Sequence, residues 1–202
     1  MKHTLLEAMA SRRTYYHLGG CEHIPVDKIL KMIEQVMLTT PSAFNVQSTR
    51  IVLLLGQEHM RLWEIVKQTL RPLVAPEAFG RTESKIDGSF AAGCATILFF
   101  EDEAAIKVQK RTMPTYADKF DIYSAQTSAM HQFAVWVMLR EMGFGASLQH
   151  YNPLIDEAVT QQWGLNPDWR LNAQMPFGRP LQEPAARVQI KPIAERLLVF
   201  GK

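Results

Sequence analysis

The spacing of hydrophobic residues along the chain predicts helices interleaved with strands. Between residues 24 and 39, apolar side chains recur every three or four positions, as on one face of an amphipathic helix. Helices are also predicted at residues 3–11, 58–74, 122–142 and 154–163. Strands are predicted at residues 50–56, 95–102, 171–178 and 196–201, the first two being buried runs. Interleaved elements with four or five strands predict a mixed α/β or α+β domain.

The helix predicted at residues 122–142 is the longest, and apolar or small residues surround most of it. A helix that is apolar on most sides is buried on most sides. In a domain of this size, the pattern predicts either a central helix or a helix shared with another subunit. Gly143 lies just past its last turn, where glycine commonly ends a helix.

Length, composition and charge limit the classes of protein to which the chain can belong. Its 202 residues suit one domain over residues 1–202, and 47% hydrophobic with 21% charged residues is typical of a globular protein. The net charge of +2 gives no electrostatic case for nucleic acid. No segment approaches the ~20 apolar residues of a membrane span, and no signal peptide is recognisable. We therefore expect a cytoplasmic protein without a membrane partner.

The two cysteines and the histidines give no sign of a metal or redox motif. Cys94 lies in an apolar stretch and is expected to be a small core residue, whereas Cys21 is expected to be a reduced loop thiol. That usage fits a reducing compartment. His17 and His23 lack the helical spacing of metal ligands. The chain also lacks the glycine-rich dinucleotide and phosphate loops and the GxSxG elbow of serine hydrolases.

Three polar segments could instead carry the chemistry, and the first is residues 11–20, which we call the arginine segment. It contains Arg12, Arg13 and Thr14, followed by Tyr16. Paired guanidinium groups offer planar donors that suit phosphate oxygens. The alternative is a solvated basic helix end that complements the helix dipole.

The second segment, residues 41–50, is called the amide loop. It carries neutral donors and acceptors at Ser42, Asn45 and Gln47, just before a predicted buried strand. Neutral groups on a rigid support suit a neutral polar ligand with several hydrogen-bonding edges. The alternative is a polar loop with a local turn at Asn45.

The third segment, residues 145–153, is called the QHY segment. Gly145 and the small residues after it allow close approach to a flat group, and Gln149, His150 and Tyr151 add polar and aromatic groups. The alternative is a strand-edge turn that precedes the helix at 154–163.

Together, in this order, the three segments resemble the FMN-dependent nitroreductase family over essentially the whole chain. "SRRTYYHLG", "LWEIVKQTL", "ATILFFED" and "ERLLVFGK" further resemble its compact branch, the nitroreductase-like proteins of the fatty-acid-repression-mutant type. Arg12-Arg13-Thr14 looks like the family's RRS motif, with threonine in place of serine. Residues 41–47 look like its PSSxNxQ loop, with Ala43 in place of the second serine.

The resemblance implies an α+β, nitroreductase-like fold, with a central mixed sheet flanked by helices and an intertwined homodimer with FMN at the interface. The amide loop is expected to reach FMN bound mainly by the partner subunit, and the backbone amides of Gln149 or His150 are expected to face the flavin. The expected cofactor-binding residues are Arg12, Arg13, Thr14, Tyr16, Ser42, Asn45, Gln47, Gln149, His150 and Lys202. Lys191 and Lys85 are alternatives to Lys202 for the phosphate.

The same resemblance implies an oxidoreductase that uses NADH or NADPH to reduce nitroaromatics, quinones or related small acceptors by a ping-pong hydride mechanism. Because the flavin carries the chemistry, no catalytic side chain is expected. Two alternatives stay open at this point. One is a flavin-binding stress or regulatory protein with little turnover, and the other is a scaffold that binds an apolar ligand among its many Met and Phe residues.

Overall fold

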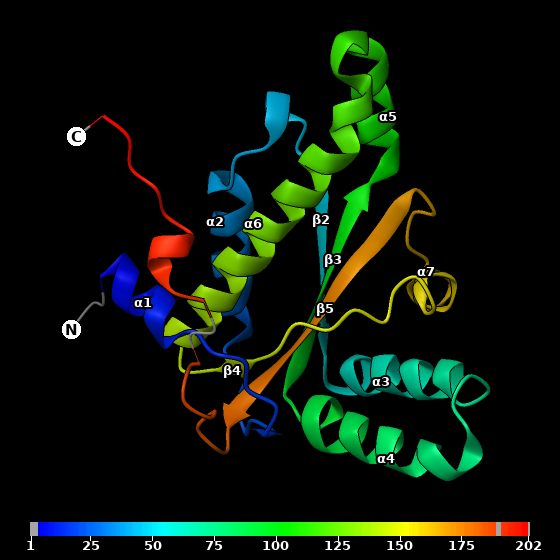
Figure 1. Ribbon diagram of the computed structural model, residues 1–202. Helices are drawn as coiled ribbons and strands as arrows, with labels where there is room; N and C mark the ends of the chain where they lie inside the picture. Colours follow the sequence, from blue (N-terminus) through cyan, green and yellow to red (C-terminus); the bar gives the residue numbers. More distant parts are fainter. Residues whose placement is uncertain (1–3, 189–190, 202) are drawn as a thin grey trace.

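The chain folds around one five-stranded sheet with helices on both faces (Figure 1). The computed structural model describes residues 4–188 and 191–201. The strands are β1 (Leu18–Gly19), β2 (Thr49–Leu55), β3 (Ala95–Asp102), β4 (Gly145–Ala146) and β5 (Trp169–Pro180). The α-helices are α1 (Leu5–Ser11), α2 (Val26–Thr39), α3 (Gly56–Leu70), α4 (Pro76–Ile86), α5 (Glu103–Thr112), α6 (Phe120–Glu141) and α7 (Asp156–Trp163). Shorter helical turns are η1 (Ala43–Asn45), η2 (Asp87–Ala91), η3 (Pro114–Lys119) and η4 (Ile193–Glu195).

The sheet has the strand order β1-β5-β3-β2, with β4 also paired to β5, and all of these pairings are antiparallel. Among the described residues, one isolated bridge, between Thr14 and Ala146, is parallel, so the sheet contains both kinds of pairing. In the central strand β3, Ile97 lies opposite Leu53 on one side and Met175 on the other. The α+β class and the number of strands predicted from the sequence are confirmed.

Both faces of β3 are buried, which explains its unbroken apolar sequence. Successive side chains of a strand point to opposite faces. Ile97 and Phe99 therefore pack with α2 and α6 on one face, whereas Leu98 and Phe100 pack with α3, η2 and α7 on the other. The core thus consists of two layers, one on each side of the sheet.

The long helix α6 crosses the first of these faces and is only half covered within this chain (Figure 1). Val135 and Leu139 are fully buried against the sheet. The opposite side of the helix exposes a stripe of large apolar side chains, 41–54% exposed, namely Ile122, Met130, Phe133 and Met138. In the part of the chain that the structure describes, no helix has the length and apolarity to cross a membrane.

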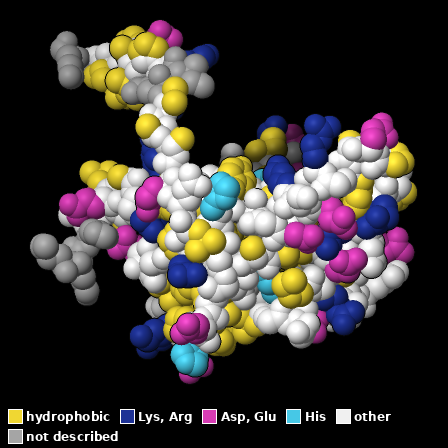
Figure 2. All heavy atoms as spheres, turned by 90° about the horizontal axis from the view of Figure 1, so that it is seen from below, with side chains coloured by type: hydrophobic (Ala, Val, Ile, Leu, Met, Phe, Trp, Pro, Cys, Tyr) yellow, Lys and Arg dark blue, Asp and Glu magenta, His cyan; other side chains and the backbone are white. Residues whose placement is uncertain are grey.

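Most elements predicted from the sequence are confirmed, but the strand predicted at 196–201 is wrong for this chain. Residues 197–200 are coil and 59–89% exposed, because none of the described strands lies beside them to complete hydrogen bonds. Figure 2 shows this C-terminal arm standing away from the body of the molecule, with hydrophobic side chains on it. The helices α4 and α5 were not predicted, since neither has a regular apolar stripe of useful length.

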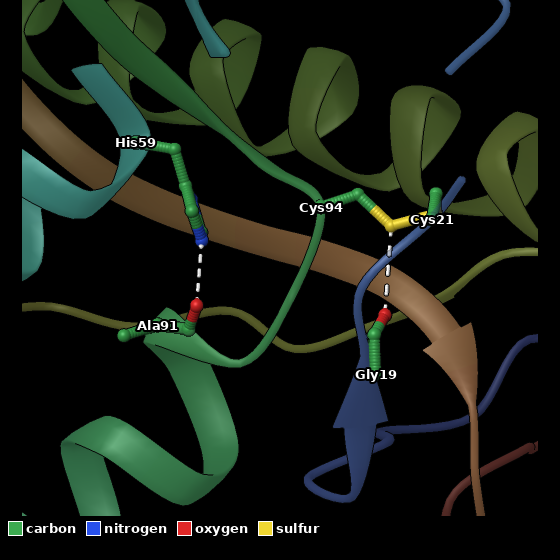
Figure 3. The surroundings of a disulfide bond; sticks show 5 residues. All are labelled: Gly19, Cys21, His59, Ala91 and Cys94. Atoms are coloured by element: carbon green, nitrogen blue, oxygen red, sulfur yellow. Dashed lines mark hydrogen bonds between the residues drawn. A yellow bond between two sulfur atoms is a disulfide. The ribbon is translucent and has the colours of Figure 1, made fainter. Parts of the chain in front are cut away.

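The expectation of unpaired cysteines is also wrong, because Cys21 and Cys94 form a disulfide (Figure 3). A separation of 73 residues along the chain gives no hint of this contact. The contact arises because β1 lies on β5 beside the start of β3, where a side chain on Gly178 would be only 2.5 Å from the Gly19 carbonyl oxygen. Disulfides are rare in the cytosol. Cysteine usage therefore no longer supports a cytoplasmic location, which stays a prediction.

We predict that the Cys21→Ser substitution lowers the free energy of unfolding by about 2–4 kcal/mol, because the disulfide restricts the unfolded chain over a long loop. Urea unfolding without reductant measures the change. Adding a dithiol reductant should lower the unfolding midpoint of the wild type and leave that of the variant unchanged. A wild-type midpoint that ignores the reductant would contradict the prediction.

Candidate functional site

The fold brings the arginine segment directly against the QHY segment. Thr14 forms a parallel bridge with Ala146, and the amide of Tyr15 donates to the Ala146 carbonyl oxygen over 3.0 Å. Gly145 permits this contact, since a Cβ atom there would lie 2.9 Å from the Tyr15 side chain. Two segments that are about 130 positions apart along the sequence are therefore neighbours. Their contact places the two segments where they can contribute to one site.

Arg12 is the residue of the arginine segment with unsatisfied hydrogen-bonding capacity. It follows the last turn of α1, and its guanidinium carbon lies 4.3 Å from the ring centroid of Trp136 on α6. Arg12 Nε and Trp136 Nε1 are both buried without a hydrogen-bond partner among the described residues. Buried donors are rarely left unpaired in folded proteins. Two such donors on stacked side chains indicate a missing acceptor.

A third arginine, Arg187, joins this cluster from the C-terminal segment. Its Nη2 donates to the carbonyl oxygens of Ala10 and Arg12 over 3.1 and 3.3 Å, while Arg13 Nη2 donates to the Ala185 carbonyl oxygen over 2.5 Å. Burial lowers the pKa of Arg12, and the positive charges of Arg187 and Arg13 lower it further. Like charges held this close favour the binding of an anion.

Arg187 was missed by the sequence reasoning, which considered three lysines instead. It is one arginine in a segment rich in proline and alanine, and no spacing links it to Arg12. Of the lysines, Lys85 lies on α4, which covers the opposite face of the sheet from α6 (Figure 1). Lys191 is exposed, and Lys202 lies outside the described residues.

The two tyrosines of the arginine segment lie in different environments. Tyr16, an expected cofactor residue, is 48% exposed, whereas Tyr15 is buried. The Tyr15 hydroxyl donates to Glu183 over 3.0 Å, and Arg140 lies over its ring. Burial raises the pKa of Tyr15, and the bond to Glu183 raises it further. Tyr15 thus fastens the C-terminal segment, and with it Arg187, onto the site.

The QHY segment is held to β5 by backbone hydrogen bonds. Gln149 and Gln174 exchange amide-to-carbonyl bonds of 2.7 and 2.9 Å, and the Gln149 side chain donates to Ser147 Oγ. The Gln149 amide is therefore already used within the chain, which corrects one of the two amides expected to face a flavin. His150 is exposed, and its amide has no partner within the described residues.

The backbone of the amide loop has three non-glycine residues in the left-handed conformation, which residues with a side chain rarely adopt. Phe44, Asn45 and Gln47 have φ angles of +53°, +54° and +50°. Such left-handed residues cost of order 1–3 kcal/mol each and concentrate at functional sites. The loop is fixed internally, since Ser42 Oγ accepts from the Gln47 amide and Asn45 Oδ1 accepts from Gln47 Nε2. These hydrogen bonds hold the loop in one conformation, although the side chains of Asn45 and Gln47 are exposed.

Neighbouring elements hold the amide loop from both ends. The ring of Phe44 lies 5.4 Å from that of Tyr116 and 5.5 Å from that of Phe120. At the other end, Ser48 and Thr49 donate hydrogen bonds of 2.5 and 2.6 Å to the fully buried carboxylate of Glu101. Sequence reasoning missed Glu101, because an acidic residue that ends an apolar strand is usually solvated.

Within one chain the amide loop does not meet the arginine segment. Phe44 packs on Phe120 and Arg12 on Trp136, and these two positions of α6 are about 24 Å apart at 1.5 Å per helical residue. Figure 1 shows η1 and α1 near opposite ends of α6. The expected site residues therefore fall into two groups in one protomer. Among the described residues, no cluster of three His, Cys, Asp or Glu side chains could hold a metal.

Comparison with known proteins identifies the family. Residues 9–179 match the family model described as the Nitroreductase family. The nitroreductase FRM2 of Saccharomyces cerevisiae is 30% identical over 187 residues, covering 92% of both chains.

Two solved structures are also similar. The nitroreductase CinD of Lactococcus lactis, in complex with chloramphenicol, is 38% identical over 97% of this chain and 99% of its own, with a TM-score of 0.87. A Desulfovibrio desulfuricans protein in complex with FMN shares the fold, with 19% identity over 100% of this chain and 99% of its own and a TM-score of 0.66. The family model matches most of the chain, and the chain belongs to the nitroreductase family, a family of oxidoreductases.

Proposed function

We propose that the protein is an FMN-dependent oxidoreductase that uses NADH or NADPH to reduce nitroaromatics, quinones or related small acceptors. The observation that carries this proposal is the convergence of Arg12, Arg13 and Arg187, with an unpaired buried donor on Arg12. A phosphate monoester supplies the anionic acceptor that this cluster lacks. Family membership and the FMN complex of the Desulfovibrio protein support the same assignment.

The residues of the chain fit the different parts of FMN. Arg12, Arg13 and Arg187 would hold the phosphate, and Thr14 and Gln149 would line the adjoining strand edge. The His150 amide would donate a hydrogen bond to the flavin ring, while Asn45 and Gln47 would form hydrogen bonds with a neutral polar edge of FMN. Bound FMN would supply hydride transfer, so the chain needs to bind, orient and leave one face of the ring open.

A homodimer would bring the two groups of residues together. If two copies of α6 pack antiparallel about a two-fold axis, the amide loop of one protomer lies beside the arginine segment of the other. The exposed apolar stripe on α6, which includes Ile122 and Phe133, would be buried in that contact. Leu5 and Leu6 of α1, 73% and 77% exposed, and the apolar C-terminal arm supply further surface for it.

We predict that the Arg12→Ala substitution raises the FMN dissociation constant by about 10–100-fold, the value of one lost charged hydrogen-bonding group. Arg187→Ala should act in the same direction. Equilibrium titration followed by flavin fluorescence measures both changes. Arg61→Ala, which removes an exposed arginine on α3, is the matched control and should leave the constant unchanged.

The visible spectrum of the purified protein tests the whole proposal. We expect flavin bands that NADH or NADPH bleaches and that a nitroaromatic or quinone restores. A colourless protein that ignores added FMN would rule out the flavin site. Tight FMN binding with negligible bleaching would instead identify a flavin-binding protein with little turnover.

We predict that the Arg12→Ala and Asn45→Ala chains complement each other when co-expressed with different affinity tags. If each site takes Arg12 from one protomer and Asn45 from the other, the mixed dimer has one intact site and one doubly altered site. FMN retention should therefore return to half the sites of the mixed dimer, although each variant alone retains little. If both residues served the same site from one chain, the mixed dimer would regain nothing, and the shared site would be disproved.

A further inference from the structure

A hollow lined by polar and apolar side chains lies between the end of α2, the amide loop, β2 and α6. Its volume is 230 Å³, and its lining includes Ser42, Gln47, Thr49, Arg50 and His131. An apolar cavity of about 150 Å³ accommodates benzene in another protein. The hollow is therefore large enough for one aromatic ring with a polar substituent and too small for a dinucleotide.

His131 is the buried polar group of this hollow with a ring nitrogen left for a ligand. The residue is only 4% exposed, and its Nδ1 lies 2.9 Å from the Thr127 carbonyl oxygen. A carbonyl oxygen only accepts, so Nδ1 carries the proton and Nε2 of the neutral ring is an acceptor. Nε2 has no hydrogen-bond partner among residues 4–188 and 191–201.

The other buried histidine shows what a purely structural role looks like in this fold. In His59, Nδ1 lies 2.8 Å from Thr96 Oγ1, and Nε2 lies 3.1 Å from the Ala91 carbonyl oxygen. Figure 3 shows the second of these contacts, between α3 and the turn before β3. Both ring nitrogens of His59 are used within the chain. His131 differs because one of its nitrogens stays available and the residue lines a hollow.

A rigid support keeps the His131 ring in place. Thr49 Oγ1 donates to Glu101 Oε1 over 2.6 Å and lies 3.4 Å from His131 Nδ1. Glu101 Oε2 accepts from Ser48 and from Ser124 of α6, the latter over 2.9 Å. The buried carboxylate thus connects β2, β3 and α6 beside Thr49, which lines the hollow. Preorganised polar groups of this kind bind a ligand without losing further side-chain entropy.

The lining of the hollow also offers donors. The Ser42 hydroxyl oxygen accepts from the Gln47 amide, so its own proton is left to donate. Arg50 is held in place by Asp102 at 2.8 Å and by the Gln47 carbonyl oxygen at 2.8 Å. The hollow therefore combines one buried acceptor with donors, and it suits a small ring that carries a hydrogen-bond donor as well as acceptor oxygens.

We propose that this hollow is the subsite that selects the electron acceptor, and that it prefers one-ring nitroaromatics bearing a hydroxyl or amide donor, which His131 Nε2 accepts. The inference rests on the proposed function, because Ser42 and Gln47 belong to the loop proposed to reach FMN. A site built to bond a hydroxyl rejects the analogue that lacks it, since its own polar atom is then left unpaired. His131 thereby sets specificity while Glu101 and Thr49 position it.

The test compares para-nitrobenzyl alcohol with para-nitrotoluene, which differ by one hydroxyl group. Calorimetry on the full-length protein, with and without FMN, should show about 3–10-fold tighter binding of the alcohol, as expected for one neutral hydrogen bond. His131→Phe should abolish this preference. His131→Gln should keep part of it, because its amide occupies the position of Nε2. The exposed His23→Phe is the matched control and should keep all of it.

Each result decides the proposal. A wild-type protein that binds neither probe, or both equally, overturns it, as does a folded His131→Phe variant that keeps the preference. If His131→Phe does not fold, the His131 ring signals of the wild type serve instead, and they should shift with the alcohol and not with para-nitrotoluene. FMN retention is measured in parallel by absorbance. If the protein retains no FMN, the proposed function is overturned. The preference of the FMN-free chain for the alcohol would then still show whether the hollow binds a hydroxyl group.

Discussion

The rigidity of α6 is the constraint on which the arrangement of the candidate site depends. One end of this helix holds the amide loop through Phe120, and the other holds Arg12 through Trp136. A helix packed on a sheet cannot shorten, so the two groups stay about 24 Å apart in one protomer. In the proposed homodimer, a two-fold axis across the exposed stripe of α6 would bring the two groups together. The length of this one helix is the reason for proposing a partner.

Two costly features of the structure are explained by the same requirement for a fixed site. The amide loop keeps Phe44, Asn45 and Gln47 in left-handed conformations, and the fully buried Glu101 accepts hydrogen bonds from hydroxyl groups. Strain and charge burial persist only where the surroundings determine the conformation. Here the carboxylate fastens the end of the loop to β3 and α6. The loop is therefore already shaped before any ligand arrives.

The sequence by itself determined most of the longer secondary elements and the identity of most polar groups. Apolar periodicity located α2, α3, α6 and β3, because a helix or strand must match its apolar side to a core. No run of apolar residues in the sequence approaches the length of a membrane span, and the net charge gave no case for nucleic acid. The motifs at residues 12–14 and 41–47 were enough to suggest the family. Apolar periodicity and short motifs each depend on residues close together in the sequence, so they can be recognised without the tertiary structure.

Tertiary structure alone decided which distant residues meet. Arg187 reaches Arg12, Cys21 pairs with Cys94, and Glu101 is buried rather than solvated, and no spacing along the chain encodes any of these contacts. Register and close glycine contacts bring such segments together, while the apolar arm at 197–200 is left without a strand beside it. The physical reason is that contact between segments depends on packing in three dimensions, whereas periodicity reports only which side of an element is apolar.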